Sequence, residues 1–116
     1  MTTGHTVMVE ASAFDNGYAD LKNGPVRVLD TLAAQLTRST SRLMIEGHTA
    51  DDASKSYNDD MSLRRAEAVK CYLHGRGIDP HRMETAGRGA SNPIATNKTA
   101  AGRELNRRVE VIVNRH

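Results

Sequence analysis

Residues 44–65, MIEGHTADDASKSYNDDMSLRR, contain the end of a strand, a polar loop and the start of a helix. Ser62 is predicted to cap that helix, because its hydroxyl can accept a hydrogen bond from an unpaired backbone N–H. Arg64 and Arg65 then fall in the first turn, where the partial positive charge of a helix disfavours cations. Two arginines there indicate a site for a carboxylate or phosphate. The alternative is that both are surface charges, solvated or paired with nearby aspartates.

Outward from this stretch, hydrophobic spacing predicts four strands and three helices. The strands are expected at 6–11, 42–46, 83–86 and 109–113, and the helices at 25–38, 62–74 and 99–105. The order β-α-β-α-β-(short α)-β predicts an α/β (α+β sandwich) fold, with one mixed sheet and helices packed on it. The first two strands are expected to be parallel. Residues 1–116 are predicted to form a single domain, with its core at about 6–114.

Composition excludes several classes of protein. The net charge of +2 is too small to indicate nucleic-acid binding, and no apolar run is long enough for this segment to insert into a membrane. The single cysteine cannot form an intrachain disulfide; Cys71 is predicted to be a small packed hydrophobe in the second helix. Composition alone leaves open a cytoplasmic protein or a piece of a longer exported one.

The sequence gives little indication of a catalytic site or a metal site. No metal site is predicted, because the histidines are scattered, and His48 is expected to be fixed at a strand end by hydrogen bonds. The acidic loop after it lacks the spacing of an EF-hand. No G-x-S-x-G motif or complete phosphate loop is present. The chain is therefore predicted not to be an enzyme and to carry no cofactor, although a paired-carboxylate hydrolase stays open.

Polar recognition is the chemistry that remains. Arg65 can bind a carboxylate, and Asn58 and Thr49 can donate or accept hydrogen bonds. Asp51 and Asp52 can accept hydrogen bonds from an ammonium group. A site that holds both an acid and a base suits a zwitterion such as the head of an amino acid.

Two long motifs resemble the OmpA-like peptidoglycan-binding domain of the OmpA / Pal / MotB family. They are GHT…YN..MS.RRAEAV..YL…GI…R and GRG…NP…N.T..GRE.NRRVEVIV, and the match covers roughly residues 14–113. The resemblance implies a non-catalytic periplasmic module, the soluble domain of an outer-membrane or envelope-anchored protein. It also implies that the module binds peptidoglycan through the zwitterionic end of the diaminopimelate residue in the peptide stem.

The resemblance assigns roles to individual residues. Arg65 matches the arginine that grips the diaminopimelate carboxylate, and Asn58 matches the asparagine before the helix. Phe14 and Asp15 match the Phe-Asp pair at the end of the first strand, near the pocket. The late motif is expected to be mainly structural; it comprises Asn97, Gly102, Arg103, Asn106, Arg107 and Arg108.

One position departs from the family pattern. The family reads H-x-D, but Ala50 stands at the position of that aspartate, and Ala53 replaces a glycine. Either Asp51 supplies the lost carboxylate or the ammonium contact is weakened. The predicted function is wall anchoring by non-covalent peptidoglycan binding. The alternatives are a diverged domain that serves protein contact, with a homodimer left open, and a small cell-wall peptide hydrolase.

Overall fold

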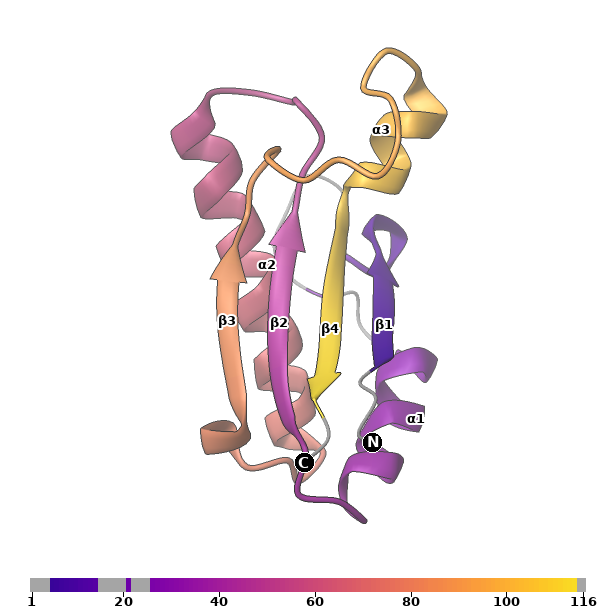
Figure 1. Cartoon of the computed structure of the whole chain (residues 1–116), viewed down its shortest axis with the longest axis vertical. Helices are drawn as coiled ribbons and strands as arrows, with labels where there is room; N and C mark the ends of the chain where they lie inside the picture. Colours follow the sequence, from indigo (N-terminus) through magenta and orange to yellow (C-terminus); the bar gives the residue numbers. More distant parts are fainter. Residues whose placement is uncertain (1–4, 15–20, 22–25, 115–116) are drawn as a thin grey trace.

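The computed structural model describes residues 5–14, 21 and 26–114. Its single sheet has the strand order β1-β4-β2-β3 (Figure 1). β4 runs antiparallel to both β1 and β2, whereas β2 and β3 are parallel. The first two strands therefore run in the same direction, as expected, but β4 lies between them. The strand bounds are β1 His5–Glu10, β2 Arg42–His48, β3 Met83–Gly87 and β4 Arg108–Asn114.

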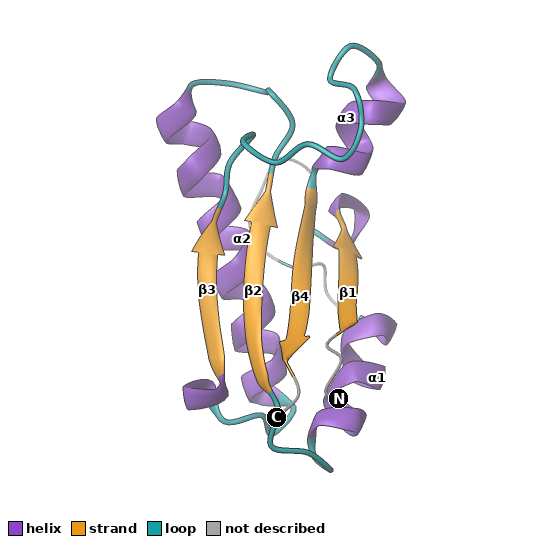
Figure 2. Ribbon diagram, viewed as in Figure 1, coloured by secondary structure: helices purple, strands orange, loops and turns teal. Residues whose placement is uncertain are grey.

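Helices connect these strands (Figure 2). The α-helices are α1 Arg27–Leu36, α2 Lys55–Gly75 and α3 Ala100–Asn106, and the 3-10 helices are η1 Ala11–Ala13 and η2 Pro80–Arg82. The predicted fold class, one mixed sheet with helices packed on it, is confirmed. None of the described helices is long and apolar enough to cross a membrane.

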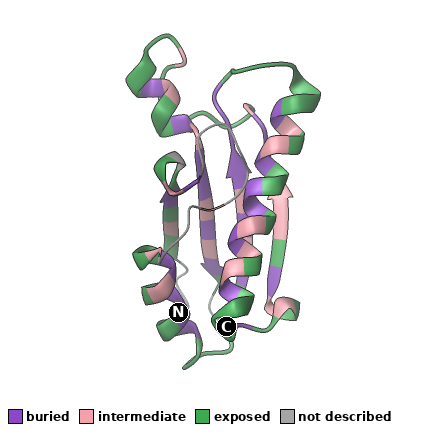
Figure 3. Cartoon of the chain, turned by 180° about the vertical axis from the view of Figure 1, so that it is seen from behind, coloured by how far each residue is buried: buried purple, intermediate pink, exposed green. Residues whose placement is uncertain are grey.

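The core lies between one face of the sheet and the helices. In β4, Val109, Val111 and Val113 are buried while the residues between them are partly exposed, which is the alternation of a sheet covered on one face. Leu29 and Leu32 of α1 pack into the same cluster, with Val69 and Leu73 of α2. Figure 3 shows α1 and α2 crossing this face. No helix in the described part of the chain covers the opposite face (Figure 1).

The start of α2 differs from the sequence prediction. Ser54, not Ser62, is the N-cap, and its Oγ accepts a hydrogen bond from the Tyr57 N–H at 3.2 Å. Ser62 lies inside the helix, fully buried, where its hydroxyl donates to the Asp59 carbonyl at 2.9 Å. The helix therefore begins about two turns earlier than predicted. The prediction failed because those two turns bury polar side chains, so their apolar period is missing.

Cys71 also differs from its prediction, since its side chain is exposed. It lies two residues from both Val69 and Leu73, which are fully buried. Two residues correspond to about 200° around a helix, so Cys71 falls on the solvent side.

Candidate functional site

Four segments meet at the carboxyl end of β2, the upper end in Figure 1. They are the 49–54 loop, the first turns of α2, the 88–99 loop and α3. Two backbone hydrogen bonds join the loops, from Thr49 N–H to the Gly89 carbonyl at 2.8 Å and from Arg88 N–H to the Gly47 carbonyl at 2.9 Å. This end of the sheet therefore holds most of the residues that the sequence predicted for binding.

Arg65 is buried, with only 7% of its surface exposed. Its guanidinium carbon lies 5.2 Å from the centre of the Phe14 ring, within the range of a cation–π contact. Burial lowers the pKa of Arg65, but arginine starts so far above neutrality that it stays a cation at pH 7. The structure thus brings Arg65 and Phe14 together in one contact.

The predicted position of Arg65 in the first helical turn is wrong. Arg65 lies almost three turns into α2, away from the free N–H groups of the helix start. Binding of an anion by Arg65 would therefore depend on the guanidinium group and not on the helix N-terminus. Arg64 is the surface charge of the pair, because its side chain is 69% exposed and its Nε lies 2.8 Å from Asp60 Oδ2.

Two buried polar side chains lie at the same end. Asn58 lies seven residues before Arg65, and therefore on the same face of α2. Its Nδ2 donates to the Ala53 carbonyl at 3.1 Å. Asn58 Oδ1 and Thr49 Oγ1 are buried and, among the described residues, have no hydrogen-bond partner. Because buried polar atoms normally find one, these two oxygens are candidates to contact a polar ligand.

The three loop positions after Thr49 have different environments. Ala50 is fully buried, and Asp51 is exposed. Asp52 forms a two-point ion pair with Arg107, in which Arg107 Nε donates to Oδ2 at 3.0 Å, and this hydrogen bond raises the pKa of Arg107. Burial lowers the pKa of Arg65, and the charges of Tyr57 and then Asp52 partly oppose that shift. Asp52, which the resemblance does not single out, is thus the loop acid whose charge reaches Arg65.

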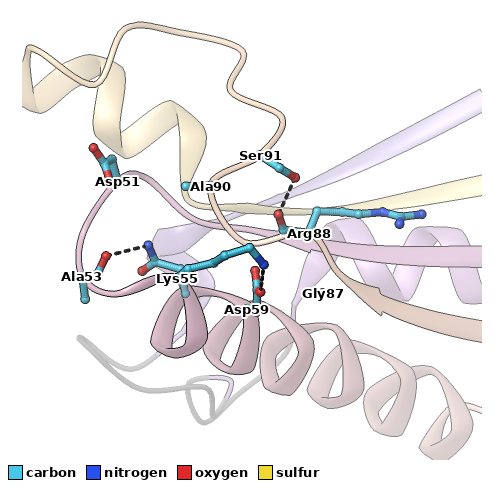
Figure 4. A pocket seen from close by; sticks show the side chains of 9 residues that line it. Asp51, Ala53, Lys55, Asp59, Gly87, Arg88, Ala90 and Ser91 are labelled. Atoms are coloured by element: carbon cyan, nitrogen blue, oxygen red, sulfur yellow. Dashed lines mark hydrogen bonds and ion pairs between the residues drawn. The ribbon is translucent and has the colours of Figure 1, made fainter.

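A surface pocket of about 440 Å³ opens beside Asn58 (Figure 4). The start of α2 and the loop after β3 form its walls. Lys55 Nζ lies 2.7 Å from Asp59 Oδ2, so two of the charges in this pocket pair with each other. Asp51 belongs to the rim of this pocket. The lining residues are Asp51, Ala53, Lys55, Asn58, Asp59, Gly87, Arg88, Ala90 and Ser91.

Within the late motif, Asn106 ties α3 to the preceding loop. It is fully buried, and its Oδ1 accepts hydrogen bonds from the N–H groups of Ile94 and Ala95 at 2.8 and 3.0 Å. Its Nδ2 donates to the Ala95 carbonyl at 3.0 Å and to Asn97 Oδ1 at 2.7 Å. Arg103 Nη1 donates to the Asn97 carbonyl at 3.0 Å. These contacts are all internal to the fold.

The other members of the late motif also contact the protein itself. Gly102 lies so close to the loop that a Cβ there would be 1.9 Å from the Thr96 carbonyl oxygen. Arg108 is buried and donates to the carbonyl oxygens of Asn106 and Asn92 at 3.1 and 3.0 Å. Arg107 connects this motif to the loop after β2 through its ion pair with Asp52. Asp15, the remaining predicted site residue, lies outside the described residues.

Comparison with known proteins places this arrangement in a family. Residues 13–107 match the OmpA family. The chain belongs to the OmpA family. It is 44% identical over 99 residues to outer membrane protein A of Bordetella avium, covering 84% of this chain and 51% of that protein. It is 39% identical over 103 residues to the peptidoglycan-binding protein ArfA of Mycobacterium tuberculosis, covering 88% of this chain and 32% of that protein.

A solved structure of similar shape is the cell wall anchor of the T6SS from Pseudomonas aeruginosa. Its TM-score is 0.86 at 26% identity, covering 100% of this chain and 87% of that one. The chain spans between about a third and a half of the two curated relatives named above.

Proposed function

We propose that this OmpA-family domain binds peptidoglycan non-covalently and anchors the protein that carries it to the cell wall, in the periplasm. The ligand group would be the zwitterionic end of a diaminopimelate residue in the peptide stem. The observation that carries the proposal is the buried Arg65 guanidinium against Phe14. Relatives named as a peptidoglycan-binding protein and a cell wall anchor support it.

The chemistry of Arg65 suits a carboxylate. A guanidinium group forms two parallel hydrogen bonds to a carboxylate, and these bonds strengthen where water is excluded. Packing against Phe14 holds the planar group before a ligand arrives. Asn58 Oδ1 and Thr49 Oγ1 would complete the polar contacts. A ligand ammonium group would be bound by a carboxylate of the 49–54 loop.

Incubation with purified sacculi tests the proposal. The domain should sediment with sacculi that contain meso-diaminopimelate and release no fragments into solution. Release of peptide fragments would instead indicate a wall hydrolase. Absence of sedimentation would favour a diverged domain that serves protein contact. The replacement of the family aspartate by Ala50 is the observation that supports this alternative.

Restoring the family carboxylate should strengthen binding. Ala50→Asp is expected to raise the affinity for a meso-diaminopimelate peptide by roughly tenfold to a hundredfold, because a charged hydrogen bond contributes about 1.5–3 kcal/mol. Calorimetric titration checks the affinity. A melting curve is needed beside it, because Ala50 is fully buried and the larger side chain could strain the loop.

Asp51→Ala in the natural background identifies the present ammonium ligand. If Asp51 fills the role, this variant loses affinity and Ala50→Asp gains little. If Asp51→Ala binds like the natural protein, Asp52 is the acid to test next, since it is the other carboxylate of the same loop and is held in place by Arg107. An affinity that responds to none of these changes would contradict a zwitterionic ligand bound by Arg65 and the 49–54 loop.

Binding should not change between about pH 6.5 and 8. The α-carboxylate of the ligand protonates only near pH 3.5, so affinity should fall in acid. Burial, followed by the charge of Arg108, lowers the pKa of His48 from its ordinary value, so His48 is neutral over this range. Calorimetry across the range checks the profile. An affinity step that disappears in His48→Gln would contradict it and place His48 in the ligand site.

A further inference from the structure

A second cluster of chemical groups lies on the uncovered face of the sheet. Glu46 and His48 are two residues apart on β2, so they share the face opposite to buried Ile45. Glu110 of β4 lies directly across from Glu46 in the antiparallel register. One potential ligand atom from each of Glu46, His48 and Glu110 lies within 4.8 Å of the other two.

The histidine of this cluster is buried without a hydrogen bond. His48 is 2% exposed, and neither ring nitrogen has a hydrogen-bond partner among the described residues. The hydrogen bonds expected from the sequence are thus not found there. Its Nε2 lies 3.8 Å from Glu46 Oε1, which is too far for a hydrogen bond. An imidazole nitrogen that lacks a hydrogen bond and faces a carboxylate can serve as a metal ligand.

Each glutamate accepts a hydrogen bond from an arginine through one of its two carboxylate oxygens. Arg88 Nη2 donates to Glu46 Oε2 at 2.8 Å, and Arg108 Nε donates to Glu110 Oε2 at 2.6 Å. These contacts orient the carboxylates, as outer partners of metal ligands do. They leave Glu46 Oε1 facing His48. The two guanidinium charges oppose a cation, so binding should be weaker than at a site of three unpaired ligands.

We propose that Glu46, His48 and Glu110 form a Zn²⁺ site between β2 and β4. One imidazole nitrogen and two carboxylate oxygens are ligands that zinc accepts, with water in the fourth position. Ca²⁺ and Mg²⁺ prefer oxygen ligands alone, so the histidine favours zinc. Ligand atoms on a tetrahedral zinc lie about 3.3 Å apart. The His48 and Glu46 atoms are 3.8 Å apart and all three ligand atoms lie within 4.8 Å of one another, so zinc binding requires the side chains to move closer together.

Sequence spacing did not show this site. Two of its three ligands are glutamates, which are common on protein surfaces, and Glu110 lies on a different strand from Glu46 and His48. Glu46 and Glu110 become neighbours only through the pairing of β2 with β4. The site does not include Arg65 or Asn58, but it borders the proposed peptidoglycan site, because His48 directly precedes Thr49 and Arg88 lines the pocket beside Asn58.

Titration of the whole chain with ZnCl₂ tests the proposal. Calorimetry should show one zinc per chain, and saturating zinc should raise the melting temperature by about 5 °C or more. Mg²⁺ and Ca²⁺ should do neither. His48→Gln and Glu110→Gln should each lower zinc affinity by about tenfold or more. In the natural protein, zinc should shift the ¹⁵N resonances of the His48 ring.

His81→Gln is the matched control. His81 Nδ1 lies 3.1 Å from Asp79 Oδ1, but both side chains are mostly exposed, at 96% and 61%. This variant should bind zinc like the natural protein. Zinc binding that survives His48→Gln, or that His81→Gln removes, would overturn the proposal, as would no zinc binding at all. If His48→Gln does not fold, Glu110→Gln and the His48 resonances still decide.

Discussion

Replacing Arg65 by alanine should weaken binding of a meso-diaminopimelate peptide about a hundredfold or more. The bound carboxylate would lose both hydrogen bonds of a buried guanidinium group, a loss on the order of 3 kcal/mol. Arg65→Lys should recover only part of the affinity, because an ammonium group keeps the charge but lacks the planar fork. Calorimetry with the peptide, and sedimentation with sacculi, measure both variants.

Arg64→Ala is the control for this experiment. Arg64 is the neighbouring residue on the same helix, but its side chain is 69% exposed and pairs with Asp60. The Arg64→Ala variant should bind the peptide with an affinity within about twofold of that of the natural protein, since exposed ion pairs contribute little. Arg65→Ala should also lower the melting temperature, because it removes a buried side chain that packs on Phe14. If folded Arg65→Ala binds as Arg64→Ala does, Arg65 does not hold the ligand.

The fold could be predicted from sequence because most of its elements have regular apolar spacing. The valines of β4 alternate, and the leucines of α1 recur at helical intervals. α2 is the exception. In its first two helical turns, the buried residues are the polar Asn58 and Ser62. Local sequence cannot distinguish a helix with a polar buried face from a polar loop. The order of the strands was not predictable either, since the pairing of β4 between β1 and β2 depends on contacts distant in sequence.

For the candidate site, the sequence predicted residues that the structure brings to one end of the sheet, but it did not predict how their side chains are packed. The prediction for Arg65 depends on a position in the first helical turn that this residue does not occupy. Its contact with Phe14 joins residues far apart in the chain. The pairing of Asp52 with Arg107 joins the two motifs and could not be inferred from either one. The environment of His48 was likewise hidden, because it depends on Glu110 of another strand. Burial and cross-strand neighbours are properties of the packed chain.

Gly47→Ala should lower the free energy of unfolding by about 3 kcal/mol and the melting temperature by roughly 10–20 °C. A Cβ at Gly47 of β2 would lie 1.8 Å from the backbone oxygen of Ser62 in α2. Because that atom belongs to helix backbone, no side-chain rotation can relieve the clash, and α2 must move away from the sheet.

The matched control for this prediction is Gly75→Ala, at the last residue of the same helix, where a Cβ would meet no atom within 4 Å. Thermal and denaturant unfolding should place this control within about 0.5 kcal/mol of the natural protein. Equal stability of the two variants would contradict the close contact between α2 and β2. Because α2 also carries Asn58 and Arg65, its displacement should weaken peptide binding in Gly47→Ala even where that variant remains folded. The glycine that begins the GHT motif would then act on the site only through the position of the helix.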